Sequence, residues 1–184
     1  MTWPRRALLA LLALLAAAFL TFVGVQAGTA AESTASRAAC PGQSNLGAPA
    51  AAQERAMLCL VNGARSSRGL EPLVAPSSLN RAADRKTGDI LRCDEFSHEA
   101  CGREFTYWMK HFGYRGCSEG ENIAWGSGSL GTPRSIFRAW MHSKGHRENI
   151  LRAYEDTGIG LRTGTLEGYG GAHVWTEEFG SRSC

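Results

Sequence analysis

Three short stretches limit what this chain can fold into more than any other feature. They are Gly-Glu-Asn-Ile-Ala-Trp-Gly at 120–126, Trp-Met-His-Ser-Lys-Gly-His-Arg-Glu-Asn-Ile-Leu at 140–151 and Val-Trp-Thr-Glu-Glu-Phe-Gly at 174–180. The first and the third contain strand candidates, which we place at 122–125 and 172–179. The second contains the end of a helical pattern. The fold is therefore expected to combine helices with strands.

Two helices are predicted before these stretches. The first covers Gln53 to about Ser67, and Gly69 follows it as a stop signal. The second opens at Pro76-Ser77, with Ser77 as its N-cap. Each helix has an apolar side at helical spacing, formed by Met57, Leu60, Val61 and Ala64 in the first and by Leu79, Ala82, Ala83 and Ile90 in the second.

Two further helices are predicted on either side of the first strand. The third ends before Gly113 and carries a stripe that we interpret as core-facing, formed by Phe105, Trp108, Met109 and Phe112. The fourth begins with Thr132 as N-cap and Pro133 as its first residue, and Gly145 is expected to end it. Its inward-facing residues are predicted to be Ile136, Ala139 and Trp140, with Ser143 as a further candidate.

The C-terminal third favours an antiparallel sheet. A further strand candidate covers 157–162, and glycine-rich turns separate it from the strand at 172–179. Four helices followed by late strands indicate a layered α/β sandwich. We assign residues 53–184 to this one domain and residues 32–52, which show no apolar period, to a linker or N-terminal arm.

Residues 1–31 are expected to be a secretory signal peptide. Arg5 and Arg6 precede an apolar run from Ala7 to about Val25, and small residues follow at once. Cleavage sites that fit are Ala27, Ala30 and Ala31. The alternative is an uncleaved membrane anchor formed by residues 7–25, because a run of about 19 apolar residues approaches the length that spans a bilayer. If the leader stays uncleaved, we expect it to anchor the protein to a membrane, and we expect no other membrane contact. If it is cleaved, we expect the protein to be extracellular.

The charge balance argues against nucleic-acid binding. The chain has 20 basic and 17 acidic residues, and Arg5 and Arg6 are the only charges before Glu32. Without these two arginines, 18 basic and 17 acidic residues leave a net charge of +1. Nucleic-acid binding needs a concentrated basic face, and no Lys/Arg run supplies one.

The six cysteines indicate disulfides, because an even number in a secreted domain favours pairing. They are Cys40, Cys59, Cys93, Cys101, Cys117 and Cys184. Spacing alone leaves all 15 pairings open. Our best single expectation is Cys93 with Cys101, which flank His98 and would clamp its loop. Free buried thiols are the alternative for some of them.

The three stretches, with His98 upstream, resemble the CAP superfamily, also called the SCP or pathogenesis-related-1 family, and its bacterial members in particular. The resemblance covers roughly Gln53 to Gly180. It implies a single-domain α-β-α sandwich with a central cavity lined by two His and two acidic residues, where some members bind a divalent metal. It implies no reaction, because biochemical roles in that family are diverse.

The candidate site consists of His98, Glu121, Ser143 and His146, which line the cleft that the resemblance implies. Two imidazoles and one carboxylate form a sufficient ligand set for zinc with an open fourth position. Ser143 stands where the second acidic residue normally lies, which should weaken the affinity for zinc or another divalent metal. The alternative is a hydrogen-bonded network of His98, Glu121 and His146 that only braces the cleft.

Several other patterns are weaker. Gly126, Gly128 and Gly131 spell G-x-G-x-x-G, but no β-α-β unit surrounds them. Ser143 and His146 lack a nucleophile elbow, so their interpretation as a nucleophile and base is disfavoured. The remaining histidines are given no role, and the tryptophans are predicted to be packing residues; these are His111, His142, His173, Trp125, Trp140 and Trp175.

Glu177 differs from the family's closing strand, which has Gln at this position, and is expected to add a charge near the site. Catalytic residues stay unassigned. The favoured function is an extracellular binding module for a lipid, a wall component or a divalent metal. The resemblance implies the lipid, because related domains have been linked to lipid binding. The alternatives are a metal-assisted hydrolase that uses His98, Glu121 and His146, and an inert scaffold.

Overall fold

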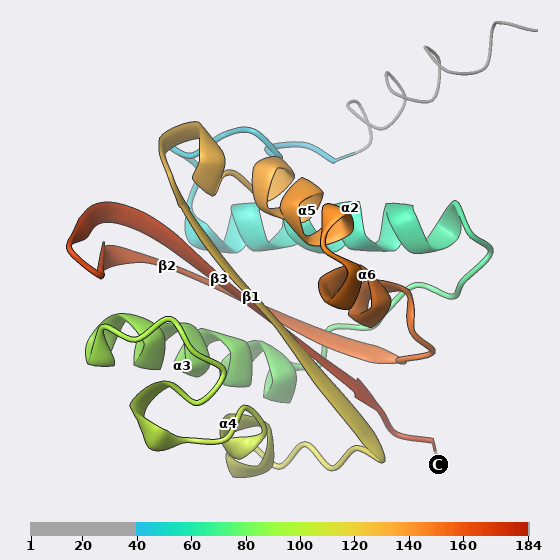
Figure 1. The fold of residues 1–184 in the computed structure, drawn as a ribbon. Helices are drawn as coiled ribbons and strands as arrows, with labels where there is room; N and C mark the ends of the chain where they lie inside the picture. Colours follow the sequence, from blue (N-terminus) through green and yellow to red (C-terminus); the bar gives the residue numbers. More distant parts are fainter. Residues whose placement is uncertain (1–39, 184) are drawn as a thin grey trace, which may run out of the picture. The chain divides into compact units, whose positions relative to one another are not determined.

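The computed structural model describes residues 40–183. The expected leader, residues 32–39 of the expected arm, and Cys184 lie outside this range. In chain order the elements, labelled as in Figure 1, are α2 (Ala50–Ser66), α3 (Ser77–Cys93), the 3-10 turn η1 (Ala100–Gly102), α4 (Tyr107–His111), β1 (Ser118–Ser127), the 3-10 turn η2 (Gly128–Gly131), α5 (Pro133–His142), α6 (Lys144–Leu151), β2 (Asp156–Leu166) and β3 (Tyr169–Ser181).

The described strands form one antiparallel sheet in the order β1-β3-β2. β3 lies in the centre, so the closing stretch at 174–180 pairs with both other strands. In β1, Glu121 lies opposite Glu178 and Asn122 lies opposite Glu177. This register decides which side chains share a face of the sheet, because successive residues of a strand point to opposite faces.

Helices cover both faces of the sheet, with α2, α5 and α6 on one side and α3 and α4 on the other (Figure 1). Trp175 and Phe179 of β3 pack in the core of the first side, together with Trp140 of α5. Val174 of β3 packs in the core of the second side with Ile90 of α3. The expected α/β sandwich with an antiparallel sheet is thus confirmed.

Helix α3 lies directly on the backbone of β2. A Cβ atom added to Gly158 would lie 2.2 Å from the carbonyl carbon of Leu79, and one added to Gly160 would lie 2.5 Å from that of Ala83. Real Cβ atoms do not approach backbone this closely, so glycine is required at both positions. This contact sets the height of α3 above the sheet, and α3 carries Lys86 and the start of the His98 loop.

The apolar sides predicted for the first two helices are largely confirmed. Leu79, Ala82, Ala83 and Ile90 are fully buried, and Met57, Leu60 and Val61 are buried. The first helix starts at Ala50, inside the range we expected for the arm. The second has Pro76 as its N-cap, not Ser77, which is already helical and makes no capping hydrogen bond.

The third predicted helix is shorter than expected. Only Tyr107–His111 is α-helical, and of its stripe Met109 alone is buried. Phe105, Trp108 and Phe112 are partly buried and pack against the cluster of Leu79, Ala82, Met109 and Tyr114. The predicted core-facing stripe is therefore right for Met109 and only partly right for the aromatic residues.

The fourth predicted helix is two helices. Thr132 is its N-cap, as expected, and its hydroxyl accepts a hydrogen bond from the backbone N–H of Ser135 at 3.2 Å. The helix α5 ends at His142, and Gly145, which we expected to end it, lies inside α6. The break is at Ser143, whose extended backbone (φ −85°, ψ 128°) turns the chain between the two helices. Ile136 and Trp140 are buried as predicted, but Ala139 is exposed.

Two disulfides are described in full. Cys40 pairs with Cys59 of α2, and Cys93 pairs with Cys101, which is the pair we expected. Cys117 is also disulfide-bonded. Cys40 is buried, and its disulfide to Cys59 holds this part of the expected arm against α2. Within residues 40–183, no helix has the length and apolar character needed to cross a membrane.

Candidate functional site

Glu121 lies at the centre of the candidate site. It stands on the edge strand β1 and points to the α3 side of the sheet, where its side chain is only 1% exposed. Lys86 of α3, 2% exposed, lies with its Nζ 3.8 Å from Glu121 Oε1. A carboxylate so deeply buried is tolerated only when charges or hydrogen bonds compensate the lost hydration. Lys86 supplies one such charge.

His98 supplies the second partner of Glu121. Its Nδ1 lies 2.6 Å from Glu121 Oε1, and its side chain is 53% exposed. Lys86 Nζ also donates a hydrogen bond to the backbone carbonyl of His98. Because a carboxylate only accepts hydrogen bonds, the Nδ1 atom of His98 carries the proton of this contact. In the neutral ring, Nε2 is then an acceptor.

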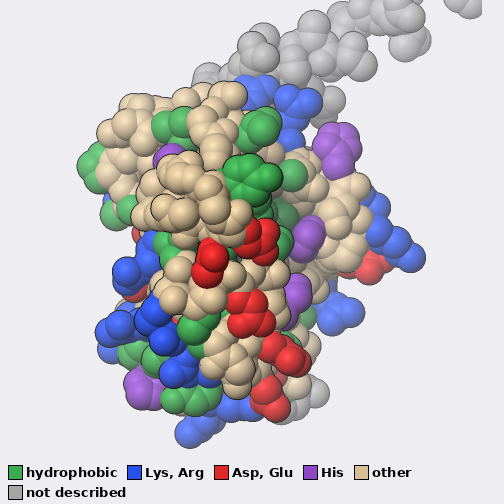
Figure 2. All heavy atoms as spheres, turned by 60° about the vertical axis from the view of Figure 1, so that its left-hand side comes forward, with side chains coloured by type: hydrophobic (Ala, Val, Ile, Leu, Met, Phe, Trp, Pro, Cys, Tyr) green, Lys and Arg blue, Asp and Glu red, His purple; other side chains and the backbone are tan. Residues whose placement is uncertain are grey.

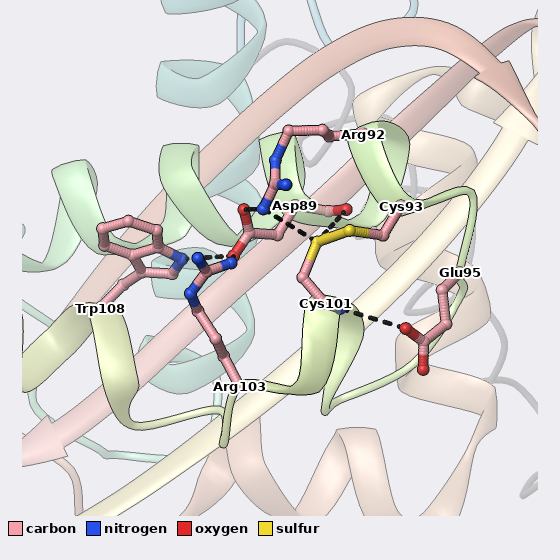
Figure 3. The surroundings of a disulfide bond; sticks show 7 residues. All are labelled: Asp89, Arg92, Cys93, Glu95, Cys101, Arg103 and Trp108. Atoms are coloured by element: carbon pink, nitrogen blue, oxygen red, sulfur yellow. Dashed lines mark hydrogen bonds and ion pairs between the residues drawn. A yellow bond between two sulfur atoms is a disulfide. The ribbon is translucent and has the colours of Figure 1, made fainter.

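The loop that carries His98 is closed by the Cys93–Cys101 disulfide (Figure 3). Asp94 follows α3 in the left-handed conformation (φ 52°), which turns the chain away from the helix. On the far side of the loop, the backbone N–H of Cys101 donates to Glu95 at 3.1 Å. The disulfide and these turns hold the ends of the loop together, so that His98 stays over Glu121.

Asp89 of α3 ties this loop to α4 (Figure 3). It accepts hydrogen bonds from Arg92, Arg103 and Trp108 at 2.8, 2.9 and 2.8 Å. Burial opposes ionisation of Asp89, but the hydrogen bonds from Arg92 and Trp108 and the charges of both arginines outweigh it and lower its pKa. Asp89 is therefore a structural anion that supports the His98 loop.

Sequence reasoning missed Glu178, which faces Glu121 from the central strand. Glu178 is fully buried, and burial together with the charge of Glu121 raises its pKa well above its ordinary value. Glu121 Oε2 and both carboxyl oxygens of Glu178 are buried without another hydrogen-bond partner. A protonated Glu178 donates to Glu121, which gives these facing oxygens a partner and leaves a single negative charge beside Lys86.

His146 approaches the site from the other side of β1. It lies on α6, where its carbonyl accepts a hydrogen bond from the side chain of Asn122 at 3.1 Å. Asn149 of α6 also donates to the carbonyl of Glu121 at 3.2 Å. Burial lowers the pKa of His146, and the charge of His98 lowers it further. The two histidines are thus close enough to influence each other.

Ser143 lies at the junction of α5 and α6 and is partly buried. Its backbone N–H bonds to the carbonyls of Ala139 and Trp140, and its hydroxyl makes no hydrogen bond to His146 or Glu121. The structure therefore brings His98 and Glu121 into direct contact and places His146 within electrostatic range. It does not join Ser143 to them.

The contacts of Glu121 bear on whether it could serve as a metal ligand. Among residues 40–183, no three His, Cys, Asp or Glu side chains are arranged to hold a metal ion. Glu121 Oε1 is engaged by His98 and Lys86, and its Oε2 faces Glu178. A lysine beside the carboxylate would also repel a divalent cation. Zinc binding is therefore a proposal that this geometry does not favour.

Glu177 does not stand near the site as a charge, contrary to our expectation. It points to the opposite face of the sheet, where burial raises its pKa to about 8. Glu177 is thus mostly protonated at neutral pH, and a protonated Glu has nearly the shape and hydrogen-bonding groups of the Gln it replaces.

The structure also places the residues of the weaker sequence patterns, which are the other histidines, three tryptophans and the glycines of the G-x-G-x-x-G pattern. His111 and His142 are exposed, and the Nδ1 of His173 lies near the carbonyl of Gly171. Trp140 and Trp175 are buried, and Trp125 is partly buried and packs against the core of the α3 side. The glycine at 126 lies near the end of β1 and those at 128 and 131 lie in the turn η2, where Trp175 Nε1 donates to the carbonyl of Gly131 at 3.0 Å.

Comparison with known proteins assigns the family. The sequence profile of the CAP family, described as the cysteine-rich secretory protein family, matches residues 58–179. The uncharacterized protein YkwD of Bacillus subtilis is 34% identical over 132 residues, which are 70% of this chain and 47% of YkwD. The chain thus spans about half the length of this relative.

Solved structures with the same fold come from secreted or surface proteins of other bacteria. An extracellular protein of Bacillus anthracis that contains a SCP domain is 21% identical, with a TM-score of 0.61 over 72% of this chain and 41% of the other. An outer surface protein of Borrelia burgdorferi is 16% identical, with a TM-score of 0.59 over 69% of this chain and 90% of the other. Together with the profile match, these similarities show that the chain belongs to the CAP family of cysteine-rich secretory proteins.

Proposed function

We propose that this protein is an extracellular binding module that recognises a polar component of the cell envelope at His98, Glu121 and His146. Its similarity to extracellular and outer surface proteins supports a place outside the cell. The signal-like residues 1–31 and the disulfides support the same place.

The observation that carries the proposal is the 2.6 Å contact between His98 Nδ1 and Glu121 Oε1. It orients an exposed imidazole so that its neutral form presents Nε2 to solvent as an acceptor. His146, with its lowered pKa, adds a second neutral imidazole nearby. These groups suit a ligand that carries hydroxyl or amine donors, as the sugars and peptides of a cell wall do. They offer little to an acyl chain, so we favour a wall component over a lipid.

A second candidate function is hydrolysis with His98 as a general base. An imidazole whose Nδ1–H is held by a buried carboxylate has the orientation that general-base catalysis uses. The nucleophile would be a water molecule, because Ser143 makes no hydrogen bond to either histidine. The same His98–Glu121 contact motivates this candidate, and release of soluble fragments from a wall substrate distinguishes it from binding alone.

The test is co-sedimentation of the oxidised protein with purified insoluble peptidoglycan. We expect saturable binding that His98→Ala/His146→Ala weakens by about tenfold, the loss of roughly one to two hydrogen bonds. The matched control, His142→Ala/His173→Ala, removes two histidines outside the site and should bind like the wild type. Absence of saturable binding, or equal binding by both double variants, would overturn the proposal. Phospholipid vesicles in a parallel arm test the lipid alternative.

A further inference from the structure

A second surface of the protein has the properties of a ligand site. We call it the α4 surface and define it by Arg103, Glu104, Tyr107, Lys110 and His111. Together with Gly102 these residues line a cavity of about 430 Å³. This volume falls within the range of small-molecule sites, roughly 300–1,000 Å³. Neither His98 nor His146 lines it, so it is separate from the site described above.

Tyr107 gives the α4 surface an exposed aromatic ring. It is 43% exposed, although large hydrophobic residues are usually more buried. The guanidinium of Arg103 lies 5.2 Å from the Tyr107 ring centre. The His111 ring, one turn further along the chain, is nearly parallel to that of Tyr107 at 6.2 Å and 15°. These contacts limit the rotamers of Tyr107 and keep its ring at the cavity.

The same surface carries an excess of positive charge. Lys110 is exposed, and Arg103 uses NH1 for Asp89, which leaves its other N–H groups able to donate. Two acids oppose it: Asp89 pairs with Arg103 and Arg92, and the Glu104 carboxylate, 81% exposed, lies 4.0 Å from Lys110 Nζ. Such an exposed pair is weak, and Glu104 can turn away.

The wider surroundings are also basic. Arg81 lies with its guanidinium 4.8 Å from the Phe112 ring, and Arg92 is exposed beside the disulfide. At the lower left of Figure 2, at the height of α3 and α4 in Figure 1, Lys and Arg side chains lie around hydrophobic side chains and a His, and a row of Asp and Glu side chains lies to their right. In a chain of nearly balanced charge, this local excess favours an anionic ligand.

We propose that the α4 surface binds an acidic sugar unit of a glycan. The apolar face of the sugar ring packs on Tyr107, and its carboxylate or phosphate is bound by Lys110 with help from Arg103. An aromatic ring beside cationic donors supplies both contacts that such a unit needs. This site lies outside the one proposed for His98 and His146, and it adds a second point of attachment to an envelope polymer.

The observations favour a glycan over a membrane surface. A bilayer is bound by several exposed apolar side chains on one face together with cations. Here Tyr107 is the exposed large hydrophobic residue, and the others described lie elsewhere: Val74 before α3, Leu130 in η2 and Tyr169 in β3. A single ring in a cavity fits one sugar unit better than a flat lipid surface.

The test is calorimetric titration of the full oxidised protein with an oligogalacturonate, and with a neutral oligomaltose as the probe without charge. We expect binding of the acidic probe alone, weakened by salt. Tyr107→Ala should weaken it about fivefold and Lys110→Gln about threefold, whereas Glu104→Gln should strengthen it about twofold. The matched controls are Tyr169→Ala, 60% exposed, and Lys144→Gln, 84% exposed, which should change nothing.

Each outcome decides the proposal. Absence of binding, equal binding of the neutral probe, or equal loss in the control variants would overturn it. Anionic vesicles bound in a Tyr107-dependent manner, with no binding of the oligogalacturonate, would reassign the surface to a membrane and also overturn it. The His98→Ala/His146→Ala variant should bind the acidic probe like the wild type, so the two proposals fail independently.

Discussion

Glu177 and Glu178 are neighbours in β3, yet the sheet gives them opposite environments. Both are fully buried, and burial raises the pKa of both. Glu177 points to the opposite face of the sheet, where Thr157 and Asn122 are its hydrogen-bond partners. Glu178 points toward α3, where Glu121 links it to Lys86 and to the exposed His98. On one face a buried acid is neutralised, and on the other a negative charge is kept and connected to solvent.

Arg65 explains why Glu177, on the α2 side of the sheet, is neutralised by a proton and not by an ion pair. Its guanidinium could balance Glu177, but it donates instead to backbone carbonyls at the ends of α2 and α6, those of Glu71, Ile150, Arg152 and Tyr154. Glu177 receives a weak hydrogen bond from Thr157 at 3.4 Å and another from Asn122, but its Oε2 is buried without a partner, and burial outweighs these contacts. On the α3 side of the sheet, Lys86 lies beside Glu121 and Glu178, and this pair of carboxyl groups keeps one negative charge.

The largest expected effect is the loss of Lys86. Lys86→Met removes the buried cation and leaves the Glu121–Glu178 pair without its compensating charge. Breaking a buried ion pair in this way costs about 3–5 kcal/mol. We expect a fall of that size in the free energy of unfolding, measured by urea denaturation at neutral pH.

The control is Lys144→Met on α6, which removes the lysine of an exposed pair with Glu148. Exposed pairs contribute less than about 1 kcal/mol, so this variant should unfold nearly like the wild type. A Lys86→Met variant as stable as the Lys144→Met variant would show that the α3 face does not depend on a buried charge.

The next effect concerns the closed face and depends on pH. Since the pKa of Glu177 is raised from 4.5 to about 8, the folded chain keeps a proton that the unfolded chain loses. This contribution to stability is complete below the unfolded pKa and is lost as pH rises toward about 8. Glu177→Gln removes the loss, so its stability advantage should grow by about 2–3 kcal/mol between about pH 5.5 and about pH 7.5.

Thermal or urea unfolding of both proteins across this range measures the difference. A constant offset between wild type and Glu177→Gln would mean that Glu177 is ionised in the folded protein. Glu119→Gln, which neutralises a partly exposed acid of β1 outside the core, is the control and should show no such trend.

The smallest effect distinguishes the two acids of the α3 face. Glu178→Gln keeps a donor toward Glu121, so we expect a change in unfolding free energy below about 1 kcal/mol at neutral pH. Glu178→Ala leaves Glu121 Oε2 unpartnered and opens a cavity, which should cost about 2–3 kcal/mol. If the Gln variant were the less stable of the two, a proton on Glu178 would be the wrong explanation for this pair.

Much of the fold was predictable because it depends on local patterns. The apolar sides of α2 and α3, the Thr132 cap and the late antiparallel strands all follow from spacing along the chain. Sequence alone predicts the helix break at Gly145 and not at Ser143, because glycine is the stronger helix breaker by itself. Tertiary contacts decided otherwise, since hydrogen bonds from Asn122 and Asn149 bind α6 to β1 as a separate helix.

The site was predictable only in part. Glu121 and the two histidines stand in recognisable motifs, but Glu178 is found only when the register of β1 against β3 is known. Lys86 did leave a signal, because it falls at helical spacing among Ala82, Ala83 and Ile90, on the side that is buried. A lysine in an apolar stripe indicates a buried partner, and that partner is Glu121.

The most direct test of the account is the tautomer of His98, read from nitrogen-15 NMR spectra of its imidazole ring in the neutral form. We predict a proton on Nδ1 in the wild type and loss of this preference in Glu121→Met, because the carboxylate at 2.6 Å holds that proton and Met offers no oxygen acceptor in its place. Since Nε2–H is the usual tautomer of a free imidazole ring, the contrast should be clear. A proton on Nε2 in the wild type, unchanged in Glu121→Met, would contradict the claim that Glu121 orients His98.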